Sequence, residues 1–219
     1  MVLDRLGNRL KFVNSCNITN MSKIYCVIDC SGSMEPFTDR TISGFNEFIQ
    51  SSPKEAKLSL LLFSDKVTVV YENVPVAKVE PLTKETYKPS GFTALLDGIG
   101  KAIELENAKA KSWADDDQDI TILIMTDGEE NSSKEYTKAR INSLITKHKM
   151  YGWKFIFMGA NQDAIRTAGE FSIGQESSLT FGCDNVKEAF RSASQAIKRC
   201  ANGEDIQFTQ LERAKSLQP

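Results

Sequence analysis

The feature that most constrains the fold is a regular alternation of short apolar runs with segments of helical spacing, from about residue 23 to residue 200. Several of the runs are nearly continuous in Ile, Leu, Val and Phe, which is typical of strands covered on both faces. Between them, apolar residues recur at the three- and four-residue intervals of a helix face. This alternation predicts an α/β fold with helices on both sides of a mostly parallel sheet. The predicted strands are 23–29, 56–64, 66–72, 119–126, 153–159 and 178–181.

Two of the predicted strands, 56–64 and 66–72, lie too close together for a parallel connection. Parallel neighbours need a crossover of a dozen or more residues, whereas here only a turn at Ser64-Asp65 is available. We therefore expect an antiparallel hairpin, with the strand 66–72 at an edge of the sheet. The resulting fold class is a doubly wound, mostly parallel six-stranded sheet with one antiparallel edge strand, similar to a Rossmann fold.

Sequence signals also mark the helices and the ends of the domain. The segment Ser132-Ser133-Lys134-Glu135 has the pattern of a capping box, which predicts a helix from there to about Lys149. An apolar stripe over 186–197 predicts the last helix, capped by Asp184 or Asn185. No period is long enough to place the two ends of the chain. We expect an N-terminal extension (1–20), one domain (21–201) and a C-terminal tail (202–219).

Charge and hydropathy exclude several classes of protein. The formal net charge is −2, from 27 basic and 29 acidic residues, and no basic stripe is present, which argues against nucleic-acid binding. The longest apolar runs, 58–63 and 120–125, are far shorter than the roughly 20 residues that cross a bilayer. The first twenty residues contain no apolar stretch of signal-peptide length. We expect a cytoplasmic protein that binds neither nucleic acid nor membrane.

The cysteines and the histidine narrow the chemistry further. Five cysteines without a C-x-x-C pair predict neither a disulfide framework nor a zinc knuckle, and Cys26 and Cys30 are expected to be buried. His148 is the only histidine, which excludes zinc sites that need two or three of them. We expect His148 on a helix surface or in the last turn of a helix, beside Lys147 and Lys149.

Polar residues whose side-chain oxygens can bind a metal lie near the ends of the predicted strands. In an open parallel sheet, functional groups gather at the carboxyl ends of the strands. Asp29, Ser31 and Ser33 follow the first strand, Asp127 follows the fourth, and Thr93 precedes a predicted helix. Carboxylate and hydroxyl oxygens suit Mg²⁺, Mn²⁺ or Ca²⁺ and disfavour zinc or copper. The sequence therefore predicts a divalent-metal site. Asp97 is left out of the ligand set, because it is expected to lie on the helix surface or to support the ligands from behind.

The spacing of the first three residues explains how they can share one cation. Alternate side chains of an extended segment point the same way, so the oxygens of Asp29, Ser31 and Ser33 can converge. Gly32 allows the turn between the serines. Neutral hydroxyls compensate less of the positive charge than carboxylates would, so the metal should attract an external anion.

These motifs resemble the metal-ion-dependent adhesion site of von Willebrand factor type A domains, and the match runs over about residues 21–200. The resemblance implies that Ser31, Ser33 and Thr93 bind the metal directly, while Asp29 and Asp127 act through bound water. The stretch 157–163 is similar to small stand-alone members of the family in bacteria and their viruses.

Three classes of function are compatible with this site: a metal-dependent protein-binding module, a metal-dependent phosphohydrolase, and an assembly component with a structural metal. For the phosphohydrolase alternative, the sequence provides neither a positioned base nor a phosphate-binding loop, so we expect no catalysis. We expect a partner protein to complete the coordination with an Asp or Glu. Asn131 and three acids, Glu35, Glu129 and Glu130, are expected at the rim of the site. The repulsion of an anion by these acids should be weaker than its direct contact with the metal. A second possibility is that one of the acids occupies the open coordination position until a partner displaces it.

Overall fold

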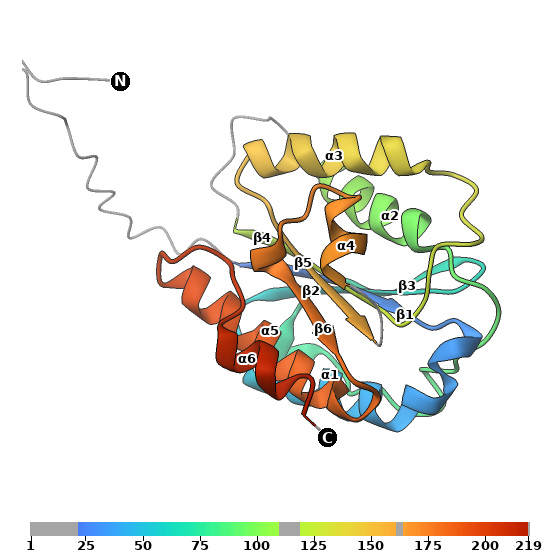
Figure 1. Cartoon of the computed structure of the whole chain (residues 1–219), viewed down its shortest axis with the longest axis horizontal. Coiled ribbons are helices and arrows are strands. Elements are labelled where there is room, and N and C mark those ends of the chain that lie inside the picture. Colours follow the sequence, from blue (N-terminus) through green and yellow to red (C-terminus); the bar gives the residue numbers. More distant parts are fainter. Residues whose placement is uncertain (1–21, 110–118, 161–163, 219) are drawn as a thin grey trace, which may run out of the picture.

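The computed structural model describes residues 22–109, 119–160 and 164–218, and it contains a single six-stranded sheet (Figure 1). The strand order is β3-β2-β1-β4-β5-β6, in which only β3 runs antiparallel to its neighbour. This confirms the predicted fold class, including the hairpin and its place at the edge. The strands are β1 Lys23–Asp29, β2 Lys57–Phe63, β3 Val67–Pro75, β4 Ile120–Thr126, β5 Lys154–Ala160 and β6 Ser178–Phe181.

Helices cover both faces of the sheet, as Figure 1 shows, with α1, α5 and α6 on one face and α2, α3 and α4 on the other. Their bounds are α1 Thr38–Ser51, α2 Leu95–Asn107, α3 Lys138–Met150, α4 Ala164–Gly169, α5 Val186–Ala201 and α6 Gln210–Lys215. Short 3₁₀ turns are η1 Gly32–Phe37, η2 Val76–Lys78, η3 Gln175–Ser177 and η4 Cys183–Asn185. None of the described helices is both long and apolar enough to span a membrane.

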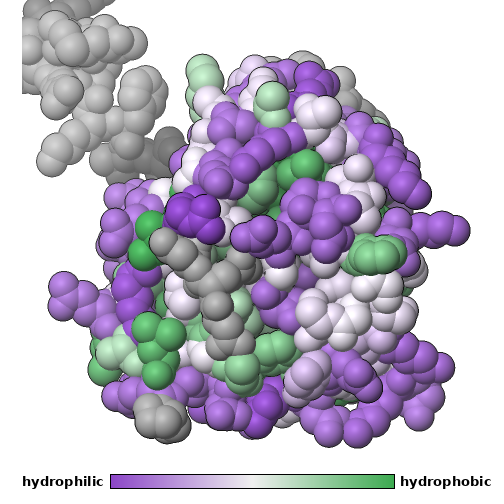
Figure 2. All heavy atoms as spheres, turned by 45° about the vertical axis from the view of Figure 1, so that its right-hand side comes forward, coloured by the Kyte–Doolittle hydropathy of each residue, from purple (hydrophilic) through white to green (hydrophobic). Residues whose placement is uncertain are grey.

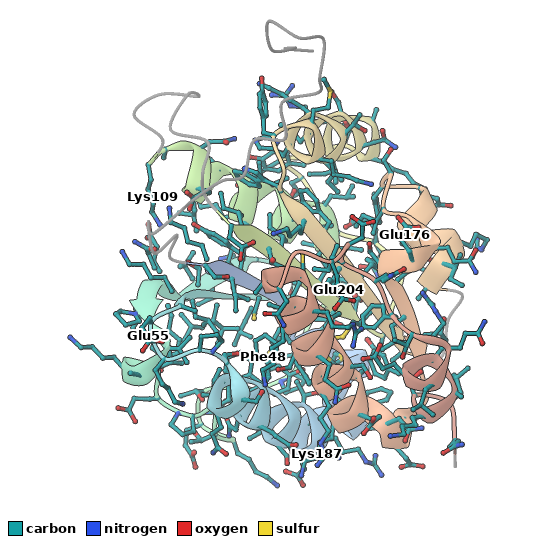
Figure 3. All side chains as sticks on the ribbon, turned by 90° about the vertical axis from the view of Figure 1, so that its left-hand side faces the viewer. Phe48, Glu55, Lys109, Glu176, Lys187 and Glu204 are labelled. Atoms are coloured by element: carbon teal, nitrogen blue, oxygen red, sulfur yellow. The ribbon has the colours of Figure 1, made fainter. Side chains whose placement is uncertain are left out.

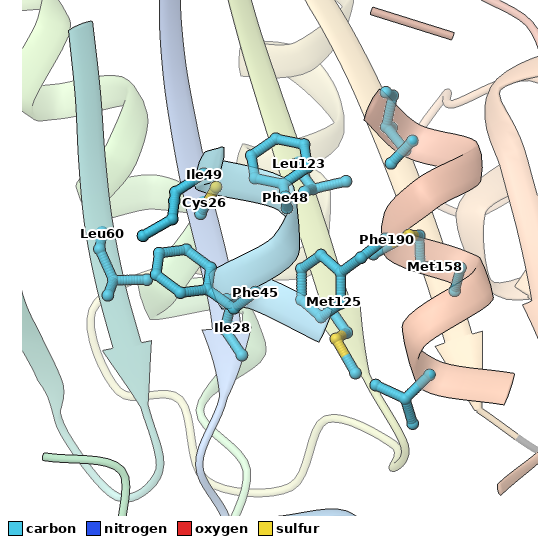
Figure 4. Packing of buried hydrophobic residues seen from close by; sticks show 14 of the residues in the cluster. Cys26, Ile28, Phe45, Phe48, Ile49, Leu60, Leu123, Met125, Met158 and Phe190 are labelled. Carbon is cyan, nitrogen blue, oxygen red and sulfur yellow. The ribbon is translucent and has the colours of Figure 1, made fainter. Parts of the chain in front are cut away.

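The two faces of the sheet bury separate apolar clusters, because alternate residues of each strand point to opposite sides. On one face, aromatic rings from α1 and α5 pack over the central strands (Figure 4). The ring centroids of Phe45 and Phe190 are 6.3 Å apart, and those of Phe48 and Phe190 are 6.0 Å apart. Cys26 lies beneath them and is fully buried, as predicted. This packing fixes the central strands that carry the candidate site.

The order of the strands determines where a site can form. The chain moves from β1 outward to β2 and β3, and then returns to place β4 on the other side of β1. In this register Ile28 lies opposite Met125, so Asp29 and Thr126 end adjacent strands. Neighbouring strands whose connections leave in opposite directions open a crevice at their carboxyl ends. The carboxyl ends of β1 and β4 lie toward the right-hand side of Figure 1.

The helix predicted to open at Ser132 begins six residues later. Helix α3 starts at Lys138, where Thr137 accepts a hydrogen bond from the backbone N–H of Arg140 at 3.3 Å. The segment before it is a loop whose backbone N–H groups donate to the carboxylates of Glu130 and Asp97, as described below. The capping-box pattern was therefore misleading here: its serines and glutamate belong to a loop.

His148 lies in the last turn of α3, one of the two predicted positions, but it is not on the surface. Its side chain is buried on α3, with Nδ1 2.7 Å from the carbonyl oxygen of Leu144 and Nε2 2.9 Å from Oδ1 of Asn107. Burial lowers the pKa of the imidazole, which favours the neutral ring. Ile141, Ile145 and His148 follow the i, i+4, i+7 spacing of one helix face, whereas the flanking lysines lie on other faces. The helical spacing of Ile141, Ile145 and His148 thus indicates the burial of His148 better than its charged sequence neighbours do.

The C-terminal tail, which the sequence did not place, packs along the outer strand of the sheet. Helix α6 is capped reciprocally by Thr209 and Glu212, and Glu212 also pairs with Arg199 of α5 at 2.8 Å. The guanidinium of Arg213 donates to the carbonyl oxygen of Ser178, in β6, at 2.6 Å. Figure 3 views the molecule from this side, with Lys187 in the first turn of α5 and Glu204 just beyond its last residue. The predicted N-terminal extension, 1–20, lies outside the described residues.

Candidate metal centre

Asp29 lies buried at the bottom of the candidate centre. It ends β1, its residue surface is 0% exposed, and both carboxylate oxygens accept hydrogen bonds from the chain itself. Oδ1 accepts from the backbone N–H of Ser31 at 2.8 Å, and Oδ2 accepts from the hydroxyl of Thr126 at 2.5 Å. Thr126 was visible in the sequence only as the residue before Asp127. Its role follows from the register of β1 and β4, which places it beside Asp29.

The other predicted residues gather above Asp29. The hydroxyl oxygens of Ser31 and Ser33 are 3.1 Å apart, and the Ser33 hydroxyl donates to Oδ1 of Asp127 at 2.8 Å. A Cβ placed on Gly128 would lie 3.6 Å from the Thr93 hydroxyl and 3.7 Å from that of Ser33. Gly128 therefore leaves space between them. The fold brings all five predicted side chains, from three separate loops, to one place.

The first two of these loops are joined through backbone hydrogen bonds. The N–H of Gly32 donates to the carbonyl oxygen of Gly91 at 3.0 Å, and that of Ser90 donates to the carbonyl of Cys30 at 2.9 Å. Gly91 has φ +75°, a conformation that side-chain-bearing residues rarely adopt. Tyr87, for which the sequence carried no signal, is buried and donates to the backbone carbonyl of Asp29 at 2.7 Å.

Asn131 joins the second and third loops through a reciprocal pair of hydrogen bonds. Its side-chain Oδ1 accepts from the backbone N–H of Thr93 at 2.8 Å, and its own N–H donates to the carbonyl oxygen of Thr93 at 3.1 Å. Thr93 is only 4% exposed, so its N–H has little access to water as a substitute partner. Asn131 thus holds the backbone of Thr93 in place.

Replacing Asn131 with Ala should lower the affinity for Mg²⁺ by about tenfold and the free energy of unfolding by about 1–2 kcal/mol, because the Thr93 N–H loses its acceptor. Calorimetric titration and thermal unfolding measure the two effects. Asn142→Ala is the matched control, because Asn142 makes a similar side-chain hydrogen bond, to the carbonyl of Glu170 at 3.0 Å, on α3. Equal Mg²⁺ affinity in both variants would contradict a positioning role for Asn131.

Glu130 is not a free acid at the rim. Its Oε1 accepts from the backbone N–H groups of Ser132 and Ser133 at 2.9 and 2.7 Å, and its Oε2 accepts from the N–H of Leu96 at 3.0 Å. The Ser133 hydroxyl adds a further bond at 2.7 Å. Of the three predicted rim acids, Glu35 and Glu129 are exposed. Glu130 instead fastens the third loop to the start of α2.

Asp97 supports the same loop from the first turn of α2. Its carboxylate accepts from three consecutive backbone N–H groups, those of Lys134, Glu135 and Tyr136, at 2.8 to 3.0 Å. Asp97 is 9% exposed and belongs to the buried polar residues. The prediction that Asp97 is a supporting group agrees with these contacts. Together with Glu130, it satisfies the backbone N–H groups of residues 132–136, which form a loop ahead of α3.

Burial raises the pKa of both carboxyls of the centre. The pKa of Asp29 is raised to about 6, chiefly by burial, with a smaller contribution from the charge of Asp127, although the bonds from Thr126 and Ser31 oppose the shift. The pKa of Asp127 is also raised by burial, against the hydrogen bond from Ser33. A nearby cation favours the charged carboxylate form of both groups. A metal that binds here would therefore displace their protons into the solvent.

The affinity for Mg²⁺ should therefore fall steeply with acidity. A metal binds the deprotonated carboxylates, so below the Asp29 pKa of about 6 the apparent affinity should drop by roughly tenfold per pH unit. Calorimetric titrations at pH 7.5, 6 and 5 test this dependence. An affinity that stays constant across this range would contradict a metal site built on Asp29.

The donor chemistry of the centre fits a hard divalent cation. Two carboxylates and three hydroxyls supply only oxygen, which suits Mg²⁺, Mn²⁺ or Ca²⁺. Within residues 22–109, 119–160 and 164–218, no three His, Cys, Asp or Glu side chains come together to form a conventional metal cluster. A cation site among these residues thus depends on the hydroxyls.

Comparison with known proteins identifies the family. The model of the von Willebrand factor type A domain matches residues 23–195. The chain belongs to this family. Von Willebrand type A domains are generally adhesion or interaction modules and not enzymes. No curated protein sequence matches the chain.

Solved structures agree with the fold of a von Willebrand type A domain. Proximal thread matrix protein 1 from the mussel byssus superposes with a TM-score of 0.57 at 16% identity, over 80% of this chain and 46% of that protein. The tip-protein domain of Mfa5 from Porphyromonas gingivalis type V pili gives 0.63 at 12% identity, over 88% and 98%. Manganese-loaded TRAP from Plasmodium vivax gives 0.53 at 17%, over 78% and 72%. The chain thus spans less than half of the mussel protein.

Proposed function

We propose that this von Willebrand type A domain is a divalent-metal-dependent protein-interaction module. The metal is held by Asp29, Ser31, Ser33, Thr93 and Asp127, and a carboxylate from a partner protein completes its coordination. The observation that carries this proposal is the convergence of three hydroxyls and two carboxylates from three interlinked loops, at the switch point of the sheet.

The contacts of each side chain support a division of roles. Both oxygens of Asp29 are already hydrogen-bonded to Ser31 and Thr126, which favours contact with the metal through water. Ser33 is exposed and its hydroxyl donates its proton to Asp127, which leaves lone-pair density on the hydroxyl oxygen for a cation. The hydroxyls of Ser31, Ser33 and Thr93 are the direct ligands. When bound, the metal supplies a positive charge that attracts an anionic group.

A partner carboxylate is the ligand best suited to this charge. Neutral hydroxyls leave the cation incompletely compensated, and a partly dehydrated cleft strengthens an ionic contact relative to bulk water. Among similar structures, the mussel protein also has a form with a zinc-occupied metal-ion-dependent adhesion site, and SpaC of Lactobacillus rhamnosus is a pilus adhesin. These relatives support a role in adhesion or protein–protein contact.

The position of His148 counts against the hydrolase alternative. The histidine is buried near the C-terminal end of α3, which precedes the amino end of β5, whereas the candidate centre lies at the carboxyl ends of the strands. It therefore cannot act as a base there. A structural metal remains the competing hypothesis, and it differs from the proposal in requiring no partner carboxylate.

Affinity capture from lysate tests the proposal. A partner should bind the native chain in Mg²⁺, elute with EDTA and fail to bind Asp127→Ala. Replacing each acidic residue of the captured partner by its amide should then identify one that is essential for the EDTA-sensitive complex. If no such replacement weakens the complex, the metal is structural.

Two of the rim acids, Glu129 and Glu130, provide a further prediction. Glu129→Gln removes a negative charge near the approach to the centre, so partner binding should be unchanged or tighter. Glu130→Gln should instead weaken binding, because Glu130 organises the third loop through four hydrogen bonds. Equilibrium binding of a captured partner to the two variants makes the comparison. Stronger binding by Glu130→Gln than by Glu129→Gln would contradict this assignment.

A further inference from the structure

Five large apolar side chains of the described residues are exposed: Phe92, Met150, Tyr151, Leu211 and Leu217. Isolated exposed apolar residues are common on protein surfaces, so only their positions carry information. Met150 and Tyr151 lie at the end of α3, before the amino end of β5, and the two leucines lie on or just beyond α6. Phe92 alone among the five lies in a loop of the candidate metal centre.

Phe92 directly precedes Thr93 and is 66% exposed. Figure 2 turns the carboxyl edge of the sheet toward the viewer, and hydrophilic side chains cover most of this face, with hydrophobic ones in separate spots. A phenylalanine stabilises the folded state chiefly when its ring is buried, so the exposed ring of Phe92 contributes little to stability. A role in binding a partner would explain why the ring of Phe92 is exposed.

The backbone around Phe92 is held from both sides. Its N–H donates to Oδ1 of Asp65, in the β2–β3 turn, at 3.0 Å. Gly91 makes room for that carboxylate, since a Cβ there would lie 2.2 Å from the Asp65 oxygen. On the other side, the N–H of Ala94 donates to the carbonyl oxygen of Ser64 at 2.9 Å. The exposed ring therefore stands on a fixed backbone.

A fixed, exposed aromatic ring is well suited to binding. Aromatic residues dominate the energy of many interfaces, and a backbone that is already ordered loses little entropy when a partner arrives. A hollow of about 340 Å³ borders the loop that carries Glu129 and Glu130, and there Lys138 and Arg166 both pair with Glu170. The apolar side chains that line it, Leu95, Leu96 and Phe171, are at most 7% exposed. Among the described residues, the exposed apolar side chain beside the centre is therefore Phe92.

We propose that Phe92 is the apolar anchor of the interaction surface, and that the partner is a peptide segment with an apolar side chain within two positions of its metal-binding Asp or Glu. This inference rests on the proposed function. Thr93 and Phe92 are consecutive, so their Cα atoms are about 3.8 Å apart. An extended partner segment rises about 3.3 Å per residue, so side chains one or two positions apart can reach both.

Selection from a phage-displayed library of random peptides tests the inference. The native chain is the target, selection is carried out in MgCl₂, and bound phage are eluted with EDTA. Eluted peptides should carry an Asp or Glu with an aromatic or aliphatic residue within two positions. Their affinity should fall by about tenfold or more for Phe92→Ala, and stay unchanged for Leu211→Ala, a matched control on α6 that is 64% exposed.

The possible outcomes separate the two proposals. EDTA-eluted peptides that carry an acid without a nearby apolar residue would overturn the anchor and leave the metal–carboxylate contact standing. So would equal affinities for the native chain and Phe92→Ala. If no peptide elutes with EDTA, the proposed function fails, and the anchor with it. Calorimetric titration of Phe92→Ala with Mg²⁺ alone shows whether any loss of peptide binding comes from the metal, and a loss of metal affinity equal to that of the peptide would also overturn the anchor.

Discussion

Asp29→Asn is expected to abolish Mg²⁺ binding and, at the same time, to make the metal-free protein more stable at pH 7. The pKa of Asp29 is raised to about 6, so keeping it ionised at neutral pH costs free energy in the folded state. Removing the charge should stabilise the fold by roughly 2 kcal/mol, or roughly 4–8 °C in Tm. Asn retains an acceptor for the Ser31 N–H and a donor toward Thr126.

The pH dependence of this gain provides its control. The folded protein holds the Asp29 proton more tightly than the unfolded chain does, so the native protein loses this stability as the pH rises from about 4 through about 6. The advantage of Asp29→Asn should therefore be present at pH 7 and small at pH 4. Thermal unfolding in EDTA at both values measures it, with Asp39→Asn, an exposed acid of α1, as control. Unchanged Mg²⁺ uptake by Asp29→Asn would remove Asp29 from the metal site.

Asp97→Ala should have the largest effect on stability, a loss of about 3 kcal/mol, because three backbone N–H groups would lose their common acceptor. The same loop carries Asn131, so the affinity for Mg²⁺ should fall as well. Asp39→Ala is the matched control: it also removes an aspartate from the first turn of a helix, but one that is exposed. Denaturant unfolding compares the two free energies.

A loss below about 0.5 kcal/mol for Asp97→Ala would show that water replaces the carboxylate at low cost. Asp97→Asn separates charge from hydrogen bonding, because the amide keeps one acceptor but cannot satisfy all three N–H groups. We expect it to lose less stability than the alanine variant. Equal losses would mean that the negative charge at the start of α2 matters more than the individual bonds.

Much of the fold could be predicted because the strands carry a strong local signal. The buried strands are almost continuous in branched and aromatic residues, and the short turn at Ser64-Asp65 leaves the antiparallel hairpin as the only connection. The five candidate metal residues could be proposed because each follows or precedes a predicted element. Their role as metal ligands remains a prediction, whereas their proximity follows from the order of the strands.

The errors arose where long-range contacts override local patterns. The start of α3 was misplaced because the segment after Asn131 folds as a loop around two carboxylates: that of Glu130, which is close in sequence, and that of Asp97, which is 37 positions away from Lys134. Asn131 could be proposed at the rim, but its pairing with Thr93 bridges 38 positions and leaves no local pattern. The tail helix α6 is six residues long, too short for a periodic signal, and depends on Arg199 and the backbone of β6.

The linkage of the three loops has a consequence for the growing chain during synthesis. Asp29, Thr93 and Asp127 are separated by 64 and then 34 positions, and Asn131 lies beyond all of them. A ribosome-bound fragment that ends before β4 has Asp29, Ser31 and Ser33 but neither Asp127 nor the clamp on Thr93. Cellular Mg²⁺ should therefore find no binding site on the nascent chain until β4 and the loop after it have emerged and docked beside β1. Metal uptake, measured on fragments of increasing length, would show the chain length at which β4 pairs with β1.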